Sequence, residues 1–417
     1  MSTALPPAVR RRLGGWGRTS AADCDVLRPP NPGSVATSLD AAGERGLIAR
    51  GCGRSYGDTS TNDRGHVVDM TALDAIESFD PDTGSIVCQA GVTMAMLVDR
   101  YLADGFVPPV CPGTGYVTVG GSVANDVHGK NHCTEGSFGD YVDWIELLLP
   151  TGELRRVTAE DRELFRATIG GIGLTGLITR VGFRMSRIGT NAVRVEERRI
   201  NGLEEFIGAL ETSIGAHKYS VGWVDALARG RHLGRGILMN ADPAPEFMTV
   251  KPRRPITVPF DLPPVAMSRL SMVLFNALYR NRVRGSRTLD VDFRRFVFPL
   301  DALLEWNRLY GKAGAVQFQC LVPSDQARPA FRKILTLASE SAVASPLAVI
   351  KTTGREGRGM LSFGRPGFSL ALDFPRRPST DALIPQLHAI TIEHGGRLYL
   401  AKDACLTPAE LSQMYPE

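Results

Sequence analysis

The sequence has little of what marks the more specialised protein classes. Its seven cysteines are scattered singly with no C-x-x-C spacing, which argues against a disulfide framework or a structural zinc site and favours a reducing compartment. Lysine and arginine (48) nearly balance aspartate and glutamate (44), so the net charge of +4 falls short of a nucleic-acid-binding surface. Polar, glycine-rich sequence follows Arg10, Arg11 and Arg12 where a signal peptide would be apolar. We therefore expect neither a signal peptide nor a transmembrane segment, and a location in the cytoplasm or at the periphery of a membrane.

What is present fits a globular chain of two or three domains, since 417 residues at about 150 per domain can bury a sizeable core. The first 190 residues alternate short β-branched runs with glycine-rich turns. This pattern predicts an α+β domain with small sheets, not a series of βαβ units. The expected strands are residues 46–50, 67–69, 86–90, 141–149 and 177–185, and the expected helices are residues 93–104 and 158–168.

The sequence changes character near residue 192, where we expect a domain boundary. Beyond it, residues 198–214 and 301–310 have the pattern of helices, and residues 315–322 and 368–374 that of strands. Between them, residues 242–287 are rich in proline and arginine and contain an apolar run.

The first informative motif is the glycine-rich stretch 49–58, Ala-Arg-Gly-Cys-Gly-Arg-Ser-Tyr-Gly-Asp, which follows an expected strand. Three glycines within seven residues let backbone N–H groups approach a phosphate closely and form an anion-binding nest. An ordinary glycine-rich turn is the alternative interpretation.

The second motif spans residues 112–132, where small side chains would let a large flat ligand lie against the main chain. It ends with His128, Lys130 and His132 at alternate positions, which share one face if the backbone is extended. A zinc-binding His-x-x-x-His pair is disfavoured, because the glutamate of a zincin is missing and Gly129 interrupts any helix. Simple surface histidines remain the alternative.

Two further motifs are weaker. Residues 171–176 match G-x-G-x-x-G, but an expected helix precedes them and an expected strand follows, the reverse of a dinucleotide-binding fingerprint. We interpret them as a helix C-terminal turn whose backbone could touch a cofactor. Residues 395–403 bring Tyr399 and Lys402 close together after a glycine-rich turn, and a surface lysine is the alternative for Lys402.

Taken in order, six motifs resemble the PCMH-type FAD-binding fold of the vanillyl-alcohol oxidase superfamily, and more narrowly the decaprenylphosphoryl-β-D-ribose 2′-oxidases. The resemblance runs from about residue 47 to residue 417. It implies an FAD-binding domain over residues 1–192, a substrate domain built on an antiparallel sheet with flanking helices over residues 193–394, and a return segment over residues 395–417 that is shorter than the family's. The motifs are residues 49–58, 117–132, 136–139, 173–176, 305–311 and 395–403.

The resemblance implies that glycine-rich backbone from several stretches surrounds FAD. The implied cofactor-binding residues are Arg50, Gly51, Cys52, Gly53, Arg54, Ser55, Tyr56, Gly57, Gly113, Thr114, Thr118, Val119, Gly120, Gly121, His128, Gly129, Gly136, Ser137, Gly173, Thr175, Gly176, Ile178 and Tyr399. No metal is implied.

The same resemblance implies a reaction, the oxidation of a sugar secondary hydroxyl to a ketone. Lys402 would sit by the reacting hydroxyl, with His128 and Tyr56 as the other catalytic residues. The implied substrate-binding residues are Trp223, Tyr310, Gln317, Gln319, Lys351 and Lys130.

The substrate implied most narrowly is the 2′-hydroxyl of decaprenylphosphoryl-β-D-ribose, in the oxidase half of the epimerisation that makes the arabinose donor for cell-wall arabinan. A separate NAD(P)H-dependent ketoreductase would then complete the epimerisation. The alternatives are an FAD oxidase of a soluble sugar, nucleoside, alditol or aldonolactone such as D-arabinono-1,4-lactone, and a flavin-binding protein without turnover.

Three departures or additions matter. Related sugar oxidases tether FAD through a histidine where this chain has Arg54, a permanently protonated group suited to pair with phosphate, so we predict noncovalent FAD.

The family's pocket cysteine is replaced by Ala371, so a reagent aimed at that thiol should not react. Residues 259–287 carry an apolar run followed by Arg280, Arg282, Arg284 and Arg287, which predicts an interfacial segment, a pocket lid, or a partly packed helix with a solvated basic end.

Overall fold

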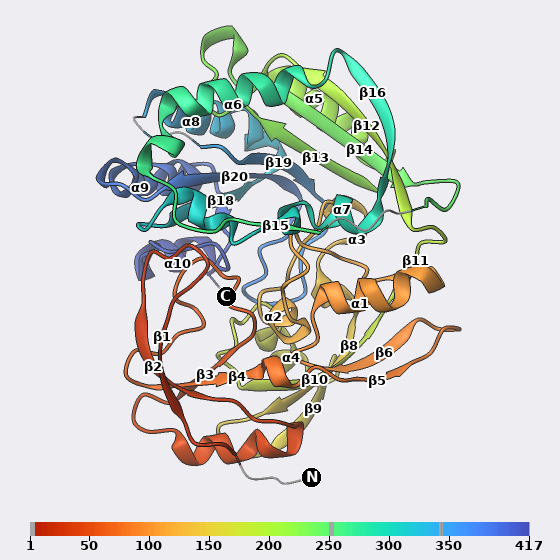
Figure 1. Ribbon diagram of the computed structural model, residues 1–417, viewed down its shortest axis with the longest axis vertical. Helices are drawn as coiled ribbons and strands as arrows, with labels where there is room; N and C mark the ends of the chain where they lie inside the picture. Colours follow the sequence, from red (N-terminus) through yellow and green to blue (C-terminus); the bar gives the residue numbers. More distant parts are fainter. Residues whose placement is uncertain (1–4, 250–253, 342, 344, 417) are drawn as a thin grey trace.

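The computed structural model describes residues 5–249, 254–341, 343 and 345–416, and it confirms the α+β class (Figure 1). The N-terminal region contains two sheets. One has four strands in the order β1-β2-β4-β3, and the other has five antiparallel strands in the order β5-β6-β10-β8-β9. Their bounds are β1 Val9–Leu13, β2 Ala22–Leu27, β3 Leu47–Arg50, β4 His66–Asp69, β5 Ile76–Phe79, β6 Ser85–Gln89, β8 Val142–Leu148, β9 Leu154–Thr158 and β10 Leu177–Arg184, with β7 Phe106–Val107 pairing with β11 Ser186–Arg187.

An eight-stranded sheet begins at β12, where the sequence changes character, and its described pairings are antiparallel. The strand order is β16-β12-β14-β13-β19-β20-β18-β21. The last strand, β21, returns from near the C-terminus to pair with Cys320 and Leu321, close to the end of β18. The bounds are β12 Ala192–Ile200, β13 Tyr219–Val224, β14 Gly236–Pro243, β16 Ser286–Asp292, β18 Ala315–Val322, β19 Ala348–Thr353, β20 Gly367–Pro375 and β21 Arg397–Leu398, while β15 Ile256–Thr257 pairs with β17 Leu303–Leu304.

Most of the helices that pack on this large sheet cover one face, and the other face is turned toward the N-terminal region, where one helix covers only the part around Trp223 (Figure 1). Strand β18 shows why, because Phe318 and Cys320 pack among the helices while Gln317 and Gln319 alternate onto the opposite face. The polar face of the sheet is therefore the one that can build a site. The helices are α1 Met94–Tyr101, α2 Val119–Ala124, α3 His132–Glu135, α4 Arg162–Thr168, α5 Leu203–Ser213, α6 Arg269–Asn281, α7 Phe293–Val297, α8 Ala327–Glu340, α9 Pro378–Glu393 and α10 Pro408–Met414, of which α5, α8 and α9 cover the sheet.

Most expected elements are confirmed within one or two residues, and α1 is capped by Thr93 as its pattern predicts. Two expected helices begin too early. Strand β9 runs to Thr158, so α4 starts only after Asp161, and β12 runs to Ile200, so α5 starts only after Gly202. In the first case the Thr158-x-x-Asp161 pattern has the residue types of a capping box, but it spans the turn between β9 and α4; in the second, charged residues near the end of β12 resemble the polar start of a helix.

The helix expected over residues 301–310 is wrong. The chain there forms two short 3-10 turns, Pro299–Ala302 and Trp306–Tyr310, separated by β17. Glu305 adopts a left-handed conformation with φ 54°, which no continuous right-handed helix can contain.

Helix α6 lies on the outside of the molecule, within the stretch expected to be an interfacial segment or lid; residues 250–253 of the proline- and arginine-rich region lie outside the described residues. Its buried residues are Met272, Asn276 and Arg280. Its exposed residues include Leu270, Leu274 and Leu278, which follow one another at four-residue spacing. The helix thus turns a mixed side with one apolar and two polar residues inward, and an apolar stripe outward. Among the helices described, none has both the length and the apolarity needed to cross a bilayer.

Candidate active site

Three stretches that are far apart in the sequence meet at the polar face of the large sheet. The backbone N–H of Tyr56 donates to the carbonyl of Ala401 (3.0 Å), and the N–H of Tyr399 donates to the carbonyl of Gln319 (3.0 Å). The hydroxyl of Tyr399 donates to the carbonyl of Asn125 (3.0 Å). The loop 50–57, the segment after α2 and the return segment therefore hold one another in place around this face.

Close backbone approaches explain several glycines of the site. A Cβ on Gly51 would lie 2.3 Å from the hydroxyl oxygen of Thr118, so the loop 50–57 can touch the start of α2 only through glycine. Gly53 has φ +63°, a conformation that favours glycine. A hypothetical Cβ on Gly113 or Gly173 would be in ordinary van der Waals contact with its nearest neighbour, Leu300 at 3.5 Å or Ile48 at 3.7 Å, so crowding does not require glycine at these two positions.

His128 lies among aromatic rings at the centre of the site. Its ring centroid is 4.8 Å from that of Tyr399 and 5.2 Å from that of Phe363. The side-chain amide of Gln319 donates to its Nε2 (3.0 Å), which leaves the ring proton on Nδ1. That Nδ1 is buried and has no hydrogen-bond partner among the described residues, so it can donate to a bound group. Burial, followed by the charge of Lys351, keeps the pKa of His128 well below its ordinary value.

Lys402 stands beside Tyr56 on the same face. Its ammonium nitrogen lies 4.3 Å from the centroid of the Tyr56 ring. Burial lowers its pKa to about 8, against the opposing attraction of Asp373. Lys351, on β19, has a pKa lowered to about 8 by burial and by the charge of Lys402. Lys402 and Lys351 thus each have a pKa near physiological pH, where a lysine can both give up and take up a proton, which suits proton transfer.

Asp373 is a residue of this candidate site that the sequence analysis did not single out. Its carboxylate accepts hydrogen bonds from the hydroxyls of Tyr56 (3.3 Å) and Tyr310 (3.4 Å) and from the amide of Gln317, its cross-strand partner. Burial raises its pKa to about 6. The available signal was an acidic residue inside an apolar strand, at a position that shares one face of the strand with Ser369 and Ala371.

The predicted substrate residues differ in how they lie relative to the polar face of the large sheet. Lys351 and Trp223 point to the same side of the sheet as Gln319, because Trp223 pairs with Val349, two residues before Lys351. The Trp223 ring is partly covered by Tyr279 of α6, 4.7 Å between centroids. Lys130 has its ammonium bound to the carbonyls of Phe296 (2.7 Å) and Val297 (3.2 Å), and burial lowers its pKa to about 7.

Other predicted cofactor residues support the loops around the site. The guanidinium of Arg50 binds the carbonyls of Gly14 (2.8 Å) and Ser60 (3.2 Å), tying the loop to the N-terminal strands. Arg54 lies over the ring of Trp16, 4.0 Å from its centroid. Gly136 and Ser137 lie against the loop after β19, and Thr175 bonds to Thr168 (3.0 Å).

Two cavities border these elements. One of about 230 Å³ lies next to the site, between Arg54, Tyr116 and Trp306. The other, of about 520 Å³, lies away from Lys402 and is lined mainly by Arg162, Arg166, Arg358, Arg397 and Tyr415, with further residues of α4 and 356–360.

Comparison with known proteins identifies the family. A family model described as an FAD binding domain matches residues 25–158. The chain is 36% identical over 432 aligned residues to decaprenylphosphoryl-beta-D-ribose oxidase of Mycolicibacterium smegmatis, an alignment that covers 100% of this chain and 94% of the relative.

Two further relatives are more distant. An uncharacterized protein of Streptomyces coelicolor is 32% identical over 78% of this chain and 92% of its own length. A putative D-arabinono-1,4-lactone oxidase of Neurospora crassa matches only 34% of this chain and 25% of its own length, at 28% identity. The chain therefore belongs to the decaprenylphosphoryl-β-D-ribose oxidase family and is an FAD-dependent oxidoreductase.

Proposed function

We propose that this protein oxidises the 2′-hydroxyl of a decaprenylphosphoryl-β-D-ribose, or a close polyprenyl homologue, to a ketone. The observation that carries the proposal is the full-length similarity to a relative of that name, combined with a buried lysine at the polar face of the sheet. A reductase that uses NAD(P)H is the class of enzyme that would consume the keto product.

The residues present fit FAD. The glycine-rich loop 50–57 meets the start of α2 at Gly51, so main chain without bulky side chains is present for a flat ring system, and the orphaned Nδ1 of His128 offers a hydrogen-bond donor. When bound, FAD supplies the acceptor for the hydride that leaves the carbon bearing the hydroxyl. The protein contributes position and electrostatics.

Lys402 is the proposed proton acceptor for the sugar hydroxyl. A general base works best with a pKa near the operating pH, and burial brings the pKa of Lys402 to about 8. Gln317, Gln319 and Lys351 lie on the same sheet face and would orient the sugar by hydrogen bonds. We propose that Tyr310, whose hydroxyl bonds to Asp373, closes the pocket from the side.

We also propose a division of labour along the chain: residues 1–192 bind FAD in a PCMH-type domain, residues 193–394 bind substrate, and residues 395–417 return to the FAD domain. The hydrogen bond from Tyr56 to Ala401 supports the return, and the start of β12 at Ala192 supports the first boundary.

The outer face of α6 is the proposed contact with a membrane that carries a lipid-linked substrate. Leu270, Leu274 and Leu278 are 81%, 61% and 66% exposed, whereas the opposite side of the helix is anchored by Asn276, which donates to Asp225 (2.7 Å). An apolar stripe on an amphipathic helix binds the interfacial region of a bilayer. Arg280 turns inward and donates to Asn201 (2.9 Å), so it does not face a membrane. The proposed membrane contact therefore depends on the apolar stripe more than on the basic end that the sequence predicts.

Anaerobic reduction of the bound flavin tests the proposed function. We expect polyprenylphosphoryl ribose to bleach the visible absorbance of the purified holoprotein, and ribose or an aldonolactone without a lipid-phosphate group to do so far more slowly. Equal bleaching by a soluble sugar would favour a soluble-sugar oxidase instead. No bleaching by any substrate of the panel, in protein that retains FAD, would contradict turnover altogether.

A further inference from the structure

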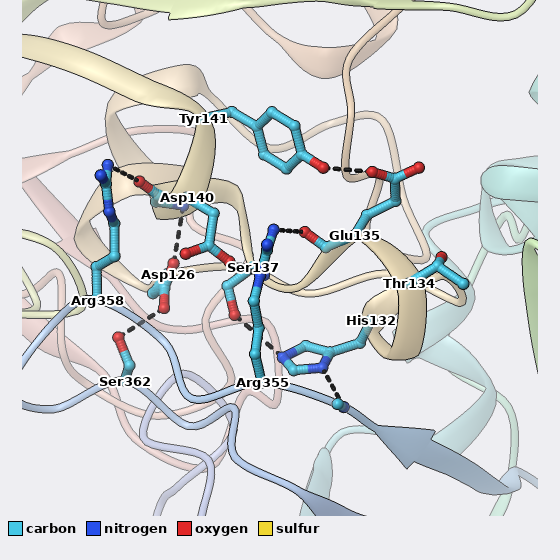
Figure 2. A network of polar contacts seen from close by, with 12 residues as sticks. Asp126, His132, Thr134, Glu135, Ser137, Asp140, Tyr141, Arg355, Arg358 and Ser362 are labelled. Carbon is cyan, nitrogen blue, oxygen red and sulfur yellow. Dashed lines mark hydrogen bonds and ion pairs between the residues drawn. The ribbon is translucent and has the colours of Figure 1, made fainter. Parts of the chain in front are cut away.

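A polar network, buried at His132 and Asp126 and exposed at Arg355, joins the loop that carries His128 to the loop that follows Lys351. The first loop, residues 125–141, lies between α2 and β8, and the second, residues 354–366, lies between β19 and β20. Figure 2 shows their contacts, with His132 at the centre and Arg355 beside it. Arg355 pairs with Asp140 (2.9 Å) and also bonds to the carbonyl of Glu135.

His132 makes two hydrogen bonds, one to each loop. The backbone N–H of Gly354 donates to its Nδ1 (3.1 Å), and its Nε2 lies 3.2 Å from the hydroxyl oxygen of Ser137. Because a backbone N–H can only donate, Nδ1 must be the acceptor, and the ring proton lies on Nε2 and is donated to Ser137. The imidazole is 1% exposed, and burial lowers its pKa to about 4, so it stays neutral in this one tautomer.

This arrangement is not that of a nucleophilic serine. A catalytic histidine accepts the serine proton at one nitrogen and donates from the other to a carboxylate. Here the nitrogen facing Ser137 carries a proton, and the second nitrogen is occupied by Gly354. His132 therefore acts as a bridge between backbone segments.

The same two loops are joined a second time at Asp126. Its carboxylate accepts from the N–H of Gly139 (2.9 Å) and from the hydroxyl of Ser362 (2.6 Å). Asp126 has φ +39°, an uncommon conformation for a residue with a side chain, and these bonds hold it there. Because His128 follows this turn by two residues, the conformation of Asp126 helps to place His128.

We propose that His132 is a positioning residue for the oxidation: its imidazole fixes the turn after Lys351 against the loop that carries His128, and so sets the spacing of these two groups across the site. The inference rests on the proposed function, since Lys351 and His128 serve substrate and cofactor there. Gly354 follows Lys351 by three residues, and Ser137 pairs as an isolated β-bridge with His128 itself. Of the two hydrogen-bond partners of His132, Ser137 is thus paired directly with His128, and Gly354 is three residues from Lys351.

Three variants of His132 separate its two bonds. His132→Phe keeps a ring and removes both nitrogens. His132→Asn keeps an acceptor near the position of Nδ1 for Gly354, and His132→Gln keeps a donor near the position of Nε2 for Ser137. The matched control is His388→Phe, because His388 is also buried but bonds to Glu410 (3.0 Å) between α9 and α10, among the helices.

Two measurements need no substrate. Hydrogen exchange at the Gly354 amide should quicken in His132→Phe and His132→Gln and stay slow in His132→Asn, where the acceptor remains. The visible absorption band of bound FAD should shift in His132→Phe as His128 moves, and should be unchanged in His388→Phe.

The rate constant of flavin reduction supplies the functional readout. We expect it to fall by up to about 100-fold in His132→Phe, with the substrate dissociation constant little changed, because misplacement by about 1 Å suffices for such a loss. His132→Asn should recover most of the rate. His388→Phe should lower the melting temperature and leave the rate intact.

Two results would overturn the positioning role: an unchanged reduction rate in folded, FAD-loaded His132→Phe, or a slow rate in His132→Asn despite restored protection of Gly354. If the unmodified protein is not reduced by polyprenylphosphoryl ribose, the proposed function fails. The exchange rate of the Gly354 amide and the position of the flavin band then still decide whether His132 fixes the position of one loop relative to the other.

Discussion

The ammonium group of Lys402 lies over the ring of Tyr56, and the hydroxyl of Tyr56 donates to the carboxylate of Asp373 (3.3 Å). A buried cation and a buried anion are thus connected through one aromatic side chain. The charged and titratable groups around Lys402 are Asp373, Lys351, His128 and Tyr56, of which Asp373 is the anion. The protonation state of Lys402 therefore depends on a residue of β20 that it does not touch as an ion pair.

Asp373→Asn should move the pH profile of flavin reduction. The reaction needs neutral Lys402, so the rate rises with pH through the pKa of this lysine, which is about 8. The Asp373 carboxylate stabilises the ammonium form and raises that pKa. Removing the carboxylate therefore lowers the pKa, and the rising limb of the profile should shift to lower pH. Stopped-flow reduction across the pH range measures the shift, and an unmoved limb in folded protein would exclude Asp373 from this role.

Lys402→Ala should spare the cofactor and nearly abolish its reduction. Loss of a general base costs about 10²–10⁴-fold in rate, whereas the glycine-lined backbone around FAD is left intact. The measurement compares visible absorbance with the anaerobic bleaching rate. Lys333→Ala is the matched control, since Lys333 is a half-exposed lysine paired with Glu393 on the helical side of the sheet. Normal bleaching in Lys402→Ala would remove this lysine from the mechanism.

How far the sequence predicts this structure depends on whether local spacing sets each element. The strands over residues 315–322 and 368–374 are confirmed because their apolar alternation is intrinsic to the segment. The helix expected over residues 301–310 is wrong because Glu305 is held in a left-handed conformation that helical periodicity does not encode. Helix α6 is a related case, since its buried Asn276 and Arg280 find partners on distant strands or loops.

The same limit applies to the site. Glycine-rich stretches indicate close backbone approach, so the loop 50–57 and the start of α2 are recognisable from the order of their residues alone. Asp373 and His132 act through partners more than 50 and 200 residues away, Gln317 and Gly354 respectively. Their roles depend on tertiary contacts, and no spacing in a single sequence specifies those contacts.

FAD should be bound without a covalent link. The family resemblance implies that Arg54 takes the place of the tethering histidine of related oxidases, and its guanidinium lies over the rings of Trp16 and Tyr116, 4.0 Å and 5.2 Å from their centroids. A guanidinium stays protonated and is a poor nucleophile. Acid precipitation of the yellow protein should therefore leave the flavin in the supernatant, as measured by its absorbance. A pellet that keeps its flavin after washing would disprove the prediction.

The α6 stripe should govern binding to lipid vesicles. Replacing Leu270, Leu274 and Leu278 by serine removes apolar area that is mostly exposed, so the fold and the flavin spectrum should survive while flotation with anionic liposomes falls several-fold. Leu174→Ser is the control, because Leu174 is 75% exposed on the G-x-G-x-x-G turn and lies outside α6. A membrane role also predicts that the triple variant loses activity toward substrate in vesicles more than toward a short-chain, detergent-soluble analogue. Equal losses on both substrates would instead assign α6 to the pocket, through the contact of Tyr279 with Trp223.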